Sequence, residues 1–205
     1  MVYVMLSRVQ CLSQLFILQG VPFEKVKPFF LDYQLPGKVG KVAVLYPPTF
    51  TESFTVKKSS HQMAAISRRG LTVINLYRSQ NANTEELILD FLSLMQKFDG
   101  QQTIVLCGDF NLCEREDKLH AFMKLLWEKG FKSLLNPPQA SHQEGCCLDQ
   151  AYCRHGEPPS RFICTAKVGT CSFSDHDAIM VSIRNIQWYK ALQWYSNIYN
   201  TMIYK

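Results

Sequence analysis

Residues 103–107 (TIVLC) run directly into Gly108-Asp109-Phe110-Asn111, and this junction constrains the fold of the 205-residue chain more than any other feature. An uninterrupted apolar run of this length is typical of a central strand that is covered on both faces. A carboxylate at the end of such a strand is costly to bury unless a metal, a cation or a hydrogen bond meets it. Because open α/β sheets place their active sites at strand ends, the junction predicts an α/β fold with a functional site beside Asp109.

Strand and helix patterns alternate from residue 42 onward. Strands are expected where short apolar or β-branched runs end at turn residues, at 42–46, 71–77, 103–107, 131–135, 148–153, 162–168 and 178–183. Asn83 can cap a helix whose apolar stripe includes Leu87, Phe91 and Leu94. A second apolar stripe over residues 119–126 predicts another helix, which ends at Gly130.

The composition fits one globular domain of an intracellular protein. Hydrophobic residues make up 47% of the chain and charged residues 19%, so it can bury a core. The net charge of +5 is compatible with a phosphate-bearing partner but falls short of a nucleic-acid-binding arm. No apolar run is long enough for a membrane-spanning helix, and the first twenty residues lack the cationic start of a signal peptide. We therefore expect no membrane partner and a location in the nucleus or the cytoplasm.

The eight cysteines do not form the pattern of a disulfide framework. They are scattered through apolar runs and include no C-x-x-C pair, so reduced and packed thiols are expected. A zinc site built from Cys146, Cys147, Cys153 and His155 stays open as an alternative, although these spacings match no common zinc module.

Three short segments carry side chains that could act together. Asp109 and Asn111 follow the buried strand. Asp149 lies within a second strand pattern, and Asp175-His176 directly precede a third. Each segment alone is weak, because Asp and Asn also stabilise turns and a lone histidine is commonly structural. Together they indicate one site, in which an imidazole beside a carboxylate rises in pKa and meets an anionic phosphate as a cation.

The segments resemble the motifs of the endonuclease/exonuclease/phosphatase superfamily of magnesium-dependent phosphodiesterases. Gly108-Asp109-Phe110-Asn111 resembles its GDFN motif, Leu148-Asp149 its "(I/L)D" strand, and Ser174-Asp175-His176 its closing SDH motif. Tyr77-Arg78-Ser79, with Asn81 nearby, is similar to its "Y-R-x-P-N" loop, although Gln80 stands in place of proline. The resemblance covers residues 41–184 and implies an incomplete four-layer α/β sandwich with two packed, mostly antiparallel sheets.

The resemblance also implies catalytic roles. Asp109 would orient and deprotonate the attacking water, and Asn111 would hold that water or the scissile phosphate. His176, braced by Asp149, would stabilise the charge that develops on the phosphorane-like transition state. Tyr77 would contact the phosphate.

Mg²⁺ is the implied cofactor, with Mn²⁺ as the alternative, and DNA is the implied partner. Asp109 and Asp175 would hold the metal, while Arg78 and Asn81 would bind phosphate. RNA and other phosphodiesters stay open as substrates, because this fold hosts all these chemistries.

The start of the chain departs from the family pattern. The family opens with a strand that carries an Asn and a second strand whose Glu is the principal metal ligand. Here only Glu24 and Asp32 are acidic before residue 42, so the first strands are expected to be missing. Metal binding is therefore expected to be impaired. The alternative function is a non-catalytic remnant that binds nucleic acid or protein.

Both ends of the chain carry further signals. Residues 1–19 resemble the last motif of superfamily-1 helicases from Helitron transposons, in which Arg8 would reach the ATP phosphates. Residues 20–40 are rich in Pro and Gly and predict a linker, so the order implies a fragment of a transposon polyprotein. Residues 185–205 predict an aromatic, basic C-terminal helix that docks on the domain or stacks on single-stranded nucleic acid.

Overall fold

A computed structural model describes the backbone of residues 2–6, 27–28 and 45–46, and both backbone and side chains of residues 52–68, 70–98, 102–113, 120–142, 145–156, 161–170 and 176–185. Several expectations lie outside these residues. They concern Arg8 and most of segment 1–19, most of the linker at 20–40, Asp175 of the SDH motif, and the C-terminal helix beyond Asn185.

The larger sheet has six strands in the order β4-β5-β6-β7-β9-β8. Their bounds are β4 Glu52–Lys57, β5 His61–Arg68, β6 Leu71–Arg78, β7 Thr103–Asp109, β8 Lys132–Ser133 and β9 Asp149–Arg154. Neighbouring strands are antiparallel except β6 and β7, which run parallel. Helix α1, Thr84–Met95, is the crossover that a parallel pair requires.

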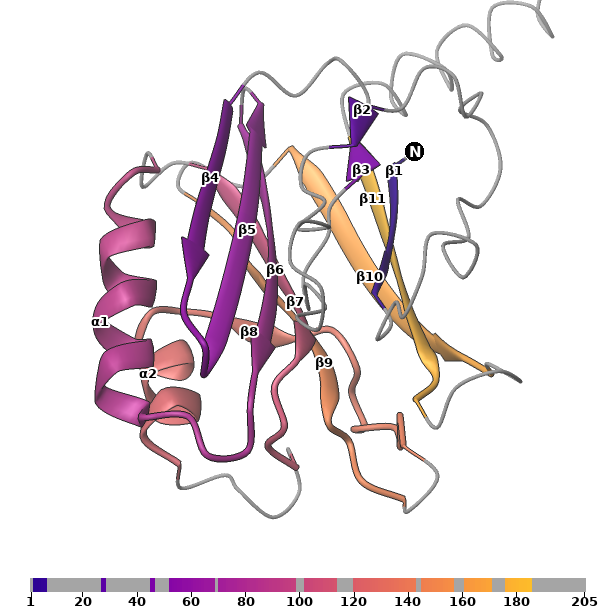
Figure 1. Cartoon of the computed structure of the whole chain (residues 1–205). Helices are drawn as coiled ribbons and strands as arrows, with labels where there is room; N and C mark the ends of the chain where they lie inside the picture. Colours follow the sequence, from indigo (N-terminus) through magenta and orange to yellow (C-terminus); the bar gives the residue numbers. More distant parts are fainter. Residues whose placement is uncertain are drawn as a thin grey trace, which may run out of the picture.

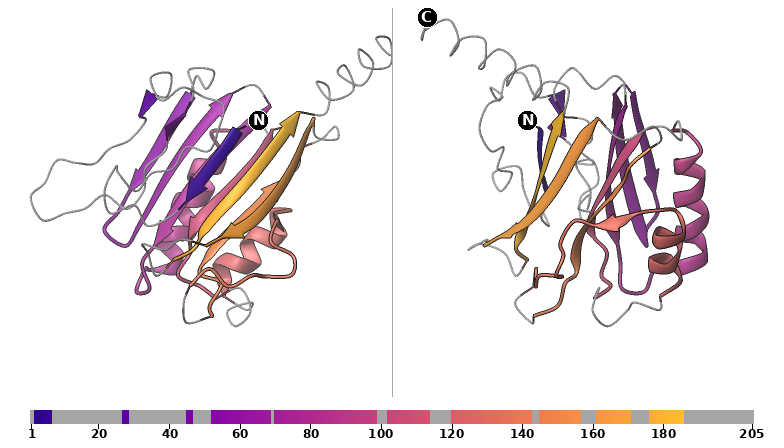
Figure 2. Two further views of the ribbon diagram at one scale, coloured as in Figure 1. Left: turned by 90° about the vertical axis from the view of Figure 1, so that its right-hand side faces the viewer. Right: turned by 180° about the vertical axis from the view of Figure 1, so that it is seen from behind.

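The smaller sheet has three antiparallel strands in the order β1-β11-β10, which span Val2–Leu6, Ala178–Asn185 and Phe162–Gly169. The N-terminal strand β1 pairs along β11, from Val2 opposite Ile183 to Leu6 opposite Ile179, and Figure 2 shows it beside that strand. Strand β11 is therefore paired on both edges. Residues 27–28 (β2) and 45–46 (β3) form a separate two-stranded ladder.

The two sheets face each other, and the helices cover the outer side of the larger one (Figure 1). Apolar side chains of both sheets fill the space between them, among them Val73, Val105, Ala151, Ile179 and Val181. Alternate residues of the larger sheet, such as Ile74, Leu76, Ile104, Leu106 and Tyr152, pack against α1 and α2, the latter spanning Ala121–Glu128. This arrangement confirms an α/β fold with two packed, mostly antiparallel sheets, and it explains why residues 103–107 are apolar throughout.

Helix α1 begins as its sequence predicts. The Asn83 side chain accepts hydrogen bonds from the backbone N–H groups of Glu85, at 2.9 Å, and Glu86, at 3.2 Å. These bonds satisfy donors that the first turn of a helix leaves open. On the inner face, the Phe91 ring meets the Phe122 ring of α2 edge-on, with centroids 5.3 Å apart. Neither described helix is long and apolar enough to cross a bilayer.

Two parts of the larger sheet differ from the sequence prediction. The hairpin of β4 and β5 was not expected, although β5 lies beside the central pair. Residues 63–66 of β5 are buried on both faces of the sheet, so they show no alternation of apolar and polar residues. The strand expected at 131–135 is wrong in length, because only Lys132–Ser133 pair with β9 before the chain turns away.

Candidate active site at the strand ends

Three of the expected site residues lie in one row across the larger sheet. In the ladder between β6 and β7, Tyr77 stands opposite Asp109, and in the ladder between β7 and β9, Asp109 stands opposite Asp149. The row lies where β6 and β7 end and β9 begins. Pairing between strands therefore brings together residues that are distant in sequence.

Gly108 allows the chain to reach this row. Its φ is +142°, and a Cβ atom built there would lie 1.9 Å from the carbonyl oxygen of Leu76 on β6. No other residue type fits at this distance, because the atom in the way belongs to the backbone of the paired strand. The glycine therefore permits the close approach of β6 and β7 beside Asp109.

His176 reaches the site from the direction of the smaller sheet, two residues before β11 begins. The backbone of His142 forms an antiparallel bridge with His176, and the N–H of Asp177 donates to the Ser141 carbonyl at 2.7 Å. The Ser141 hydroxyl in turn accepts from the N–H of Asp149 at 2.8 Å. Residues 141–142 thus connect the start of β9 to the segment that carries His176.

Asp149 and His176 form a buried hydrogen-bonded pair. The His176 Nδ1 lies 2.6 Å from the Asp149 Oδ2, and the two residues are 1% and 3% exposed. Burial raises the pKa of the Asp149 carboxyl, while its hydrogen bonds with His176 and Ser141 act in the opposite direction. The His142 ring meets the His176 ring edge-on, with centroids 4.9 Å apart, and helps to fix its orientation.

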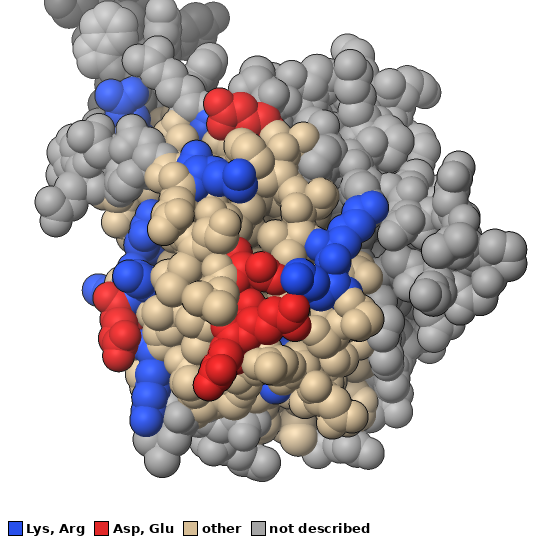
Figure 3. Space-filling view, turned by 60° about the vertical axis from the view of Figure 1, so that its left-hand side comes forward, with Lys and Arg blue, Asp and Glu red and all other residues tan. Residues whose placement is uncertain are grey.

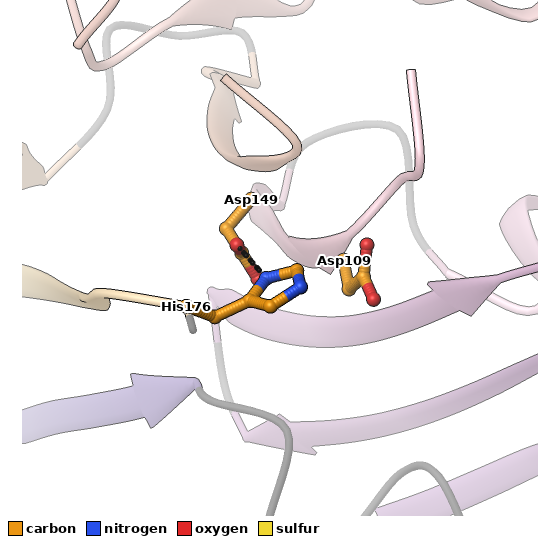
Figure 4. A group of neighbouring side chains, drawn as sticks. All are labelled: Asp109, Asp149 and His176. Carbon is orange, nitrogen blue, oxygen red and sulfur yellow. Dashed lines mark hydrogen bonds and ion pairs between the residues drawn. The ribbon is translucent and has the colours of Figure 1, made fainter. Parts of the chain in front are cut away.

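Asp109 completes a group of three side chains. Single ligand atoms of Asp109, Asp149 and His176 all lie within 4.8 Å of one another. Figure 4 shows the three side chains turned toward a common space, with His176 drawn between the two carboxyl groups. This is the group of three metal-ligating side chains found among the described residues.

Asn111 and Arg78 tie the ends of β6 and β7 together. The Asn111 amide donates to the Arg78 carbonyl at 2.6 Å, and the Arg78 Nη1 donates to the Asn111 carbonyl at 3.3 Å. Asn111 has a φ of +45°, which asparagine tolerates, and its N–H donates to the Asp109 Oδ1 at 3.0 Å. Arg78 is buried, and its Nη2 also donates to the Gln80 carbonyl. Both residues hold the turn that presents Asp109.

The remaining expectations are distributed as follows. Tyr77 is buried on β6, at one end of the row. Asn81 is exposed on the loop that leads from β6 to α1. Sequence reasoning assigned no role to Gln150, whose buried amide donates to the carbonyls of Leu112 and Cys147 and so holds the loop after Asn111 against β9. A polar residue beside Asp149 in an otherwise apolar strand is the signal that could have identified it.

The donor set determines which ion the group could hold. Carboxylate oxygens from Asp109 and Asp149 suit Mg²⁺ or Mn²⁺, and an imidazole nitrogen suits Mn²⁺ better than Mg²⁺. The two carboxylates therefore fit either cation, and Mn²⁺ would be favoured only where the neutral His176 ring joins them as a ligand. The Cys153 sulfur of the alternative zinc set lies 3.8 and 3.7 Å from the two ring nitrogens of His155, but the described residues bring together Asp109, Asp149 and His176, and not the zinc set, as a group that could hold a metal.

No protein-family model matches the chain, and no curated protein matches it. Solved structures do. The endonuclease domain of TRAS1, a telomere-specific non-LTR retrotransposon, aligns with a TM-score of 0.56 and 17% identity over 80% of this chain and 81% of that domain. CdtB, the biologically active subunit of cytolethal distending toxin, aligns with a TM-score of 0.54 and 16% identity over 73% of this chain and 64% of its own.

A third structure, cytolethal distending toxin from Actinobacillus actinomycetemcomitans, aligns with a TM-score of 0.51 and 15% identity over 70% of this chain and 63% of its own. The chain thus spans somewhat less than two thirds of the toxin chains. At these identities the likeness establishes the fold, which is consistent with the endonuclease/exonuclease/phosphatase α/β sandwich. The comparisons give no support to the helicase resemblance of residues 1–19.

Proposed function

We propose that this protein is a phosphodiester hydrolase of the DNA endonuclease type that uses Mg²⁺ or Mn²⁺. The observation that carries the proposal is the convergence of Asp109, Asp149 and His176 at the strand ends, with ligand atoms within 4.8 Å of one another. The fold shared with the TRAS1 endonuclease domain supports DNA as the substrate. We further propose that the protein acts in the nucleus or the cytoplasm.

The geometry supports a division of labour among these residues. The Asp149 carboxylate lies at the His176 Nδ1, and the protonated form of the ring, in which both nitrogens carry a proton, would donate from Nδ1 to Asp149 and from Nε2 to a phosphate oxygen. Asp109 then serves as the base that takes the proton of the attacking water. The backbone N–H of Asn111 holds the Asp109 carboxylate in place. A contact between the Asn111 side chain and phosphate stays a prediction.

Other residues would contribute to phosphate and metal binding. Tyr77, Arg78 and Asn81 are proposed to bind the substrate, with Asn81 being the exposed member of the three. Asp109, with Asp175 beyond the described residues, would hold the divalent cation. When bound, that cation supplies charge stabilisation for the phosphoryl oxygens.

The face that carries α1 and β4 does not look like a phosphate-binding surface. Figure 3 shows acidic and basic side chains intermixed over the described part of this face. Lys58 is paired there with Glu86 at 3.1 Å and lies 4.0 Å from Asp90. Because phosphate binding needs a surplus of cations, we place the DNA at the strand ends rather than over the helices.

Nicking of supercoiled plasmid by the purified chain tests the proposal. Nicking that requires Mg²⁺ or Mn²⁺ is expected, with a loss of at least about 100-fold on Asp109→Asn or His176→Ala. Glu128→Gln, a change of an exposed acid on α2, is the matched control and leaves the rate unchanged. Activity in Asp109→Asn equal to that of the control would refute the assignment.

One observation favours a second candidate, a non-catalytic remnant that binds nucleic acid or protein. No glutamate joins the metal-ligating group among the described residues, whereas the family resemblance calls for one as the main ligand. Salt-sensitive DNA binding that is indifferent both to divalent cations and to Asp109→Asn would support this candidate. The origin from a transposon polyprotein, with Arg8 in a helicase remnant, stays a prediction.

A further inference from the structure

The row of site residues continues beyond Tyr77 to the edge of the larger sheet. In the ladder between β5 and β6, Gln62 stands opposite Tyr77, and in the ladder between β4 and β5, Lys57 stands opposite Gln62. Figure 1 shows these strands side by side. Residues directly opposite each other in paired strands point to the same face of a sheet, so Lys57 and Gln62 share a face with Tyr77 and Asp109.

The core clusters show that this face is the one turned away from the helices. Tyr77 packs among the residues between the two sheets. Val56, which precedes Lys57, and Met63, which follows Gln62, pack on the helical side instead. Because side chains alternate along a strand, Lys57 and Gln62 point to the side on which Tyr77 lies.

The row passes from the interior to the solvent as it crosses the sheet. Asp149, Asp109 and Tyr77 are buried, Gln62 is partly buried, and Lys57 is exposed. The two carboxyl groups of the row are thus at its buried end, and its one cation is at its exposed end. A phosphate backbone that enters from the exposed end meets an ammonium group and an amide before it reaches the carboxyl groups.

The span of the row suits several nucleotides. Neighbouring strands lie about 4.8 Å apart, so Lys57 on β4 is about 14 Å from Asp109 on β7, which is the third strand along. One strand of duplex DNA advances about 3.4 Å along the helix axis per nucleotide, so this distance corresponds to about four nucleotides. Lys57 is therefore placed to meet a phosphate other than the one that is cleaved beside Asp109.

We propose that Gln62 and Lys57 bind backbone phosphates of DNA beyond the scissile one, so that the substrate crosses the sheet along the row toward β4. This inference rests on the proposed function, because it takes Asp109 and Asp149 as the place of cleavage. Lysine and glutamine side chains commonly contact phosphate in protein–DNA complexes, and such contacts position the DNA without reading its sequence. Binding through this part of the site is therefore independent of base sequence.

Binding of a fluorescein-labelled DNA duplex of about 20 base pairs, followed by fluorescence anisotropy in EDTA, tests the proposal without cleavage. Each phosphate that a cation neutralises contributes about 0.9 to the slope of log K against log salt. Lys57→Gln should therefore lower this slope by about one and weaken binding about eightfold at about 0.1 M salt, if both proteins bind alike at about 1 M. Gln62→Ala should weaken binding and leave the slope unchanged, because a neutral amide releases no counterion.

Lys58→Gln is the matched control, because it removes the same charge from the adjacent residue. The Lys58 Nζ lies 3.1 Å from the Glu86 carboxylate of α1, so this side chain points to the helical side of the sheet. Its affinity for the duplex should stay within about twofold of that of wild type, with the same slope. Lys57→Arg keeps the charge and should restore both the affinity and the slope.

Three outcomes would overturn the proposal. They are a wild-type chain that does not bind the duplex, an unchanged slope for Lys57→Gln, and an equal loss of affinity in Lys58→Gln, which would indicate a general effect of net charge. The assay needs neither a metal ion nor cleavage, so it is read separately from plasmid nicking. Nicking by the wild type with an unchanged slope for Lys57→Gln would refute only this path of the DNA, whereas the expected loss of slope without any nicking would refute only the hydrolase.

Discussion

Replacing Gly108 by alanine should destabilise the fold more than any other single methyl group added at a described glycine. The new Cβ would lie 1.9 Å from the Leu76 carbonyl oxygen, 2.8 Å from the Leu76 carbonyl carbon and 2.9 Å from the Asn75 Oδ1. Ordinary contact begins at 3.4 Å, so β7 would have to retreat from β6 by about 1.5 Å. Such a retreat breaks the ladder on which the site row depends.

The expected loss has two parts. A non-glycine residue in this backbone conformation costs about 1–3 kcal/mol. Each ladder hydrogen bond lost adds about 1 kcal/mol, so a total of about 3–5 kcal/mol is expected when two are broken. Domains of this size are stable by only about 5–15 kcal/mol, so the variant should unfold at a much lower urea concentration, or fail to fold.

Urea unfolding followed by circular dichroism measures the effect, and Gly145→Ala is the matched control. Gly145 also has a positive φ, +82°, but a Cβ there would have no neighbour within 4 Å. The control therefore isolates backbone strain, which should cost about 1–2 kcal/mol. If Gly108→Ala loses no more stability than Gly145→Ala, the close approach of β6 and β7 does not constrain this position, and the reasoning fails.

Three further changes test other parts of the structure. Asn83→Ala removes the cap of α1 and should lower the unfolding free energy by about 1 kcal/mol, measured by urea unfolding, with exposed Asn81→Ala as a control that has no such effect. Phe91→Ala empties a fully buried site between α1 and α2 and should cost about 3–5 kcal/mol with an unchanged m-value; a loss below about 1 kcal/mol would contradict the packing. Asp149→Asn tests the raised pKa of Asp149: the folded chain binds this proton more tightly than the unfolded chain, so the carboxyl's contribution to stability should fall as the pH rises above 3.8, its ordinary pKa. The stability of wild type relative to Asp149→Asn should therefore decline between that pH and the folded-state pKa, and a rise over this range would show that the pKa is lowered instead.

The centre of the fold could be predicted from the sequence because its residues satisfy simple rules. Residues 103–107 are apolar on both faces, and they form β7, which is covered by the smaller sheet on one side and by helices on the other. Asn83 and the stripe of Leu87, Phe91 and Leu94 predict α1, and in the structure Asn83 is its N-cap and the three apolar residues are its buried face. These are local patterns that the surrounding structure does not override.

The rest depends on contacts between distant segments. The hairpin of β4 and β5 was missed because residues 63–66 are buried on both faces while β4, at the sheet edge, is mostly exposed. The pairing of β1 with β11 could not be predicted either, since residues 2–6 carry no signal that names their partner strand. In the site, the motifs indicated Asp109, Asp149 and His176, but the supporting contacts of Ser141, His142 and Gln150 appear only in three dimensions.

The row of Tyr77, Asp109 and Asp149 has a consequence for which length changes the chain can accept. The position of each member depends on the register of its own strand. One inserted residue within β7 would therefore shift Asp109 by about 3.3 Å and turn its carboxylate to the helical side of the sheet. An insertion in the loop between β6 and α1 leaves the register of the strands unchanged. Homologous chains that keep this chemistry should therefore vary in loop length and hold their strand lengths constant.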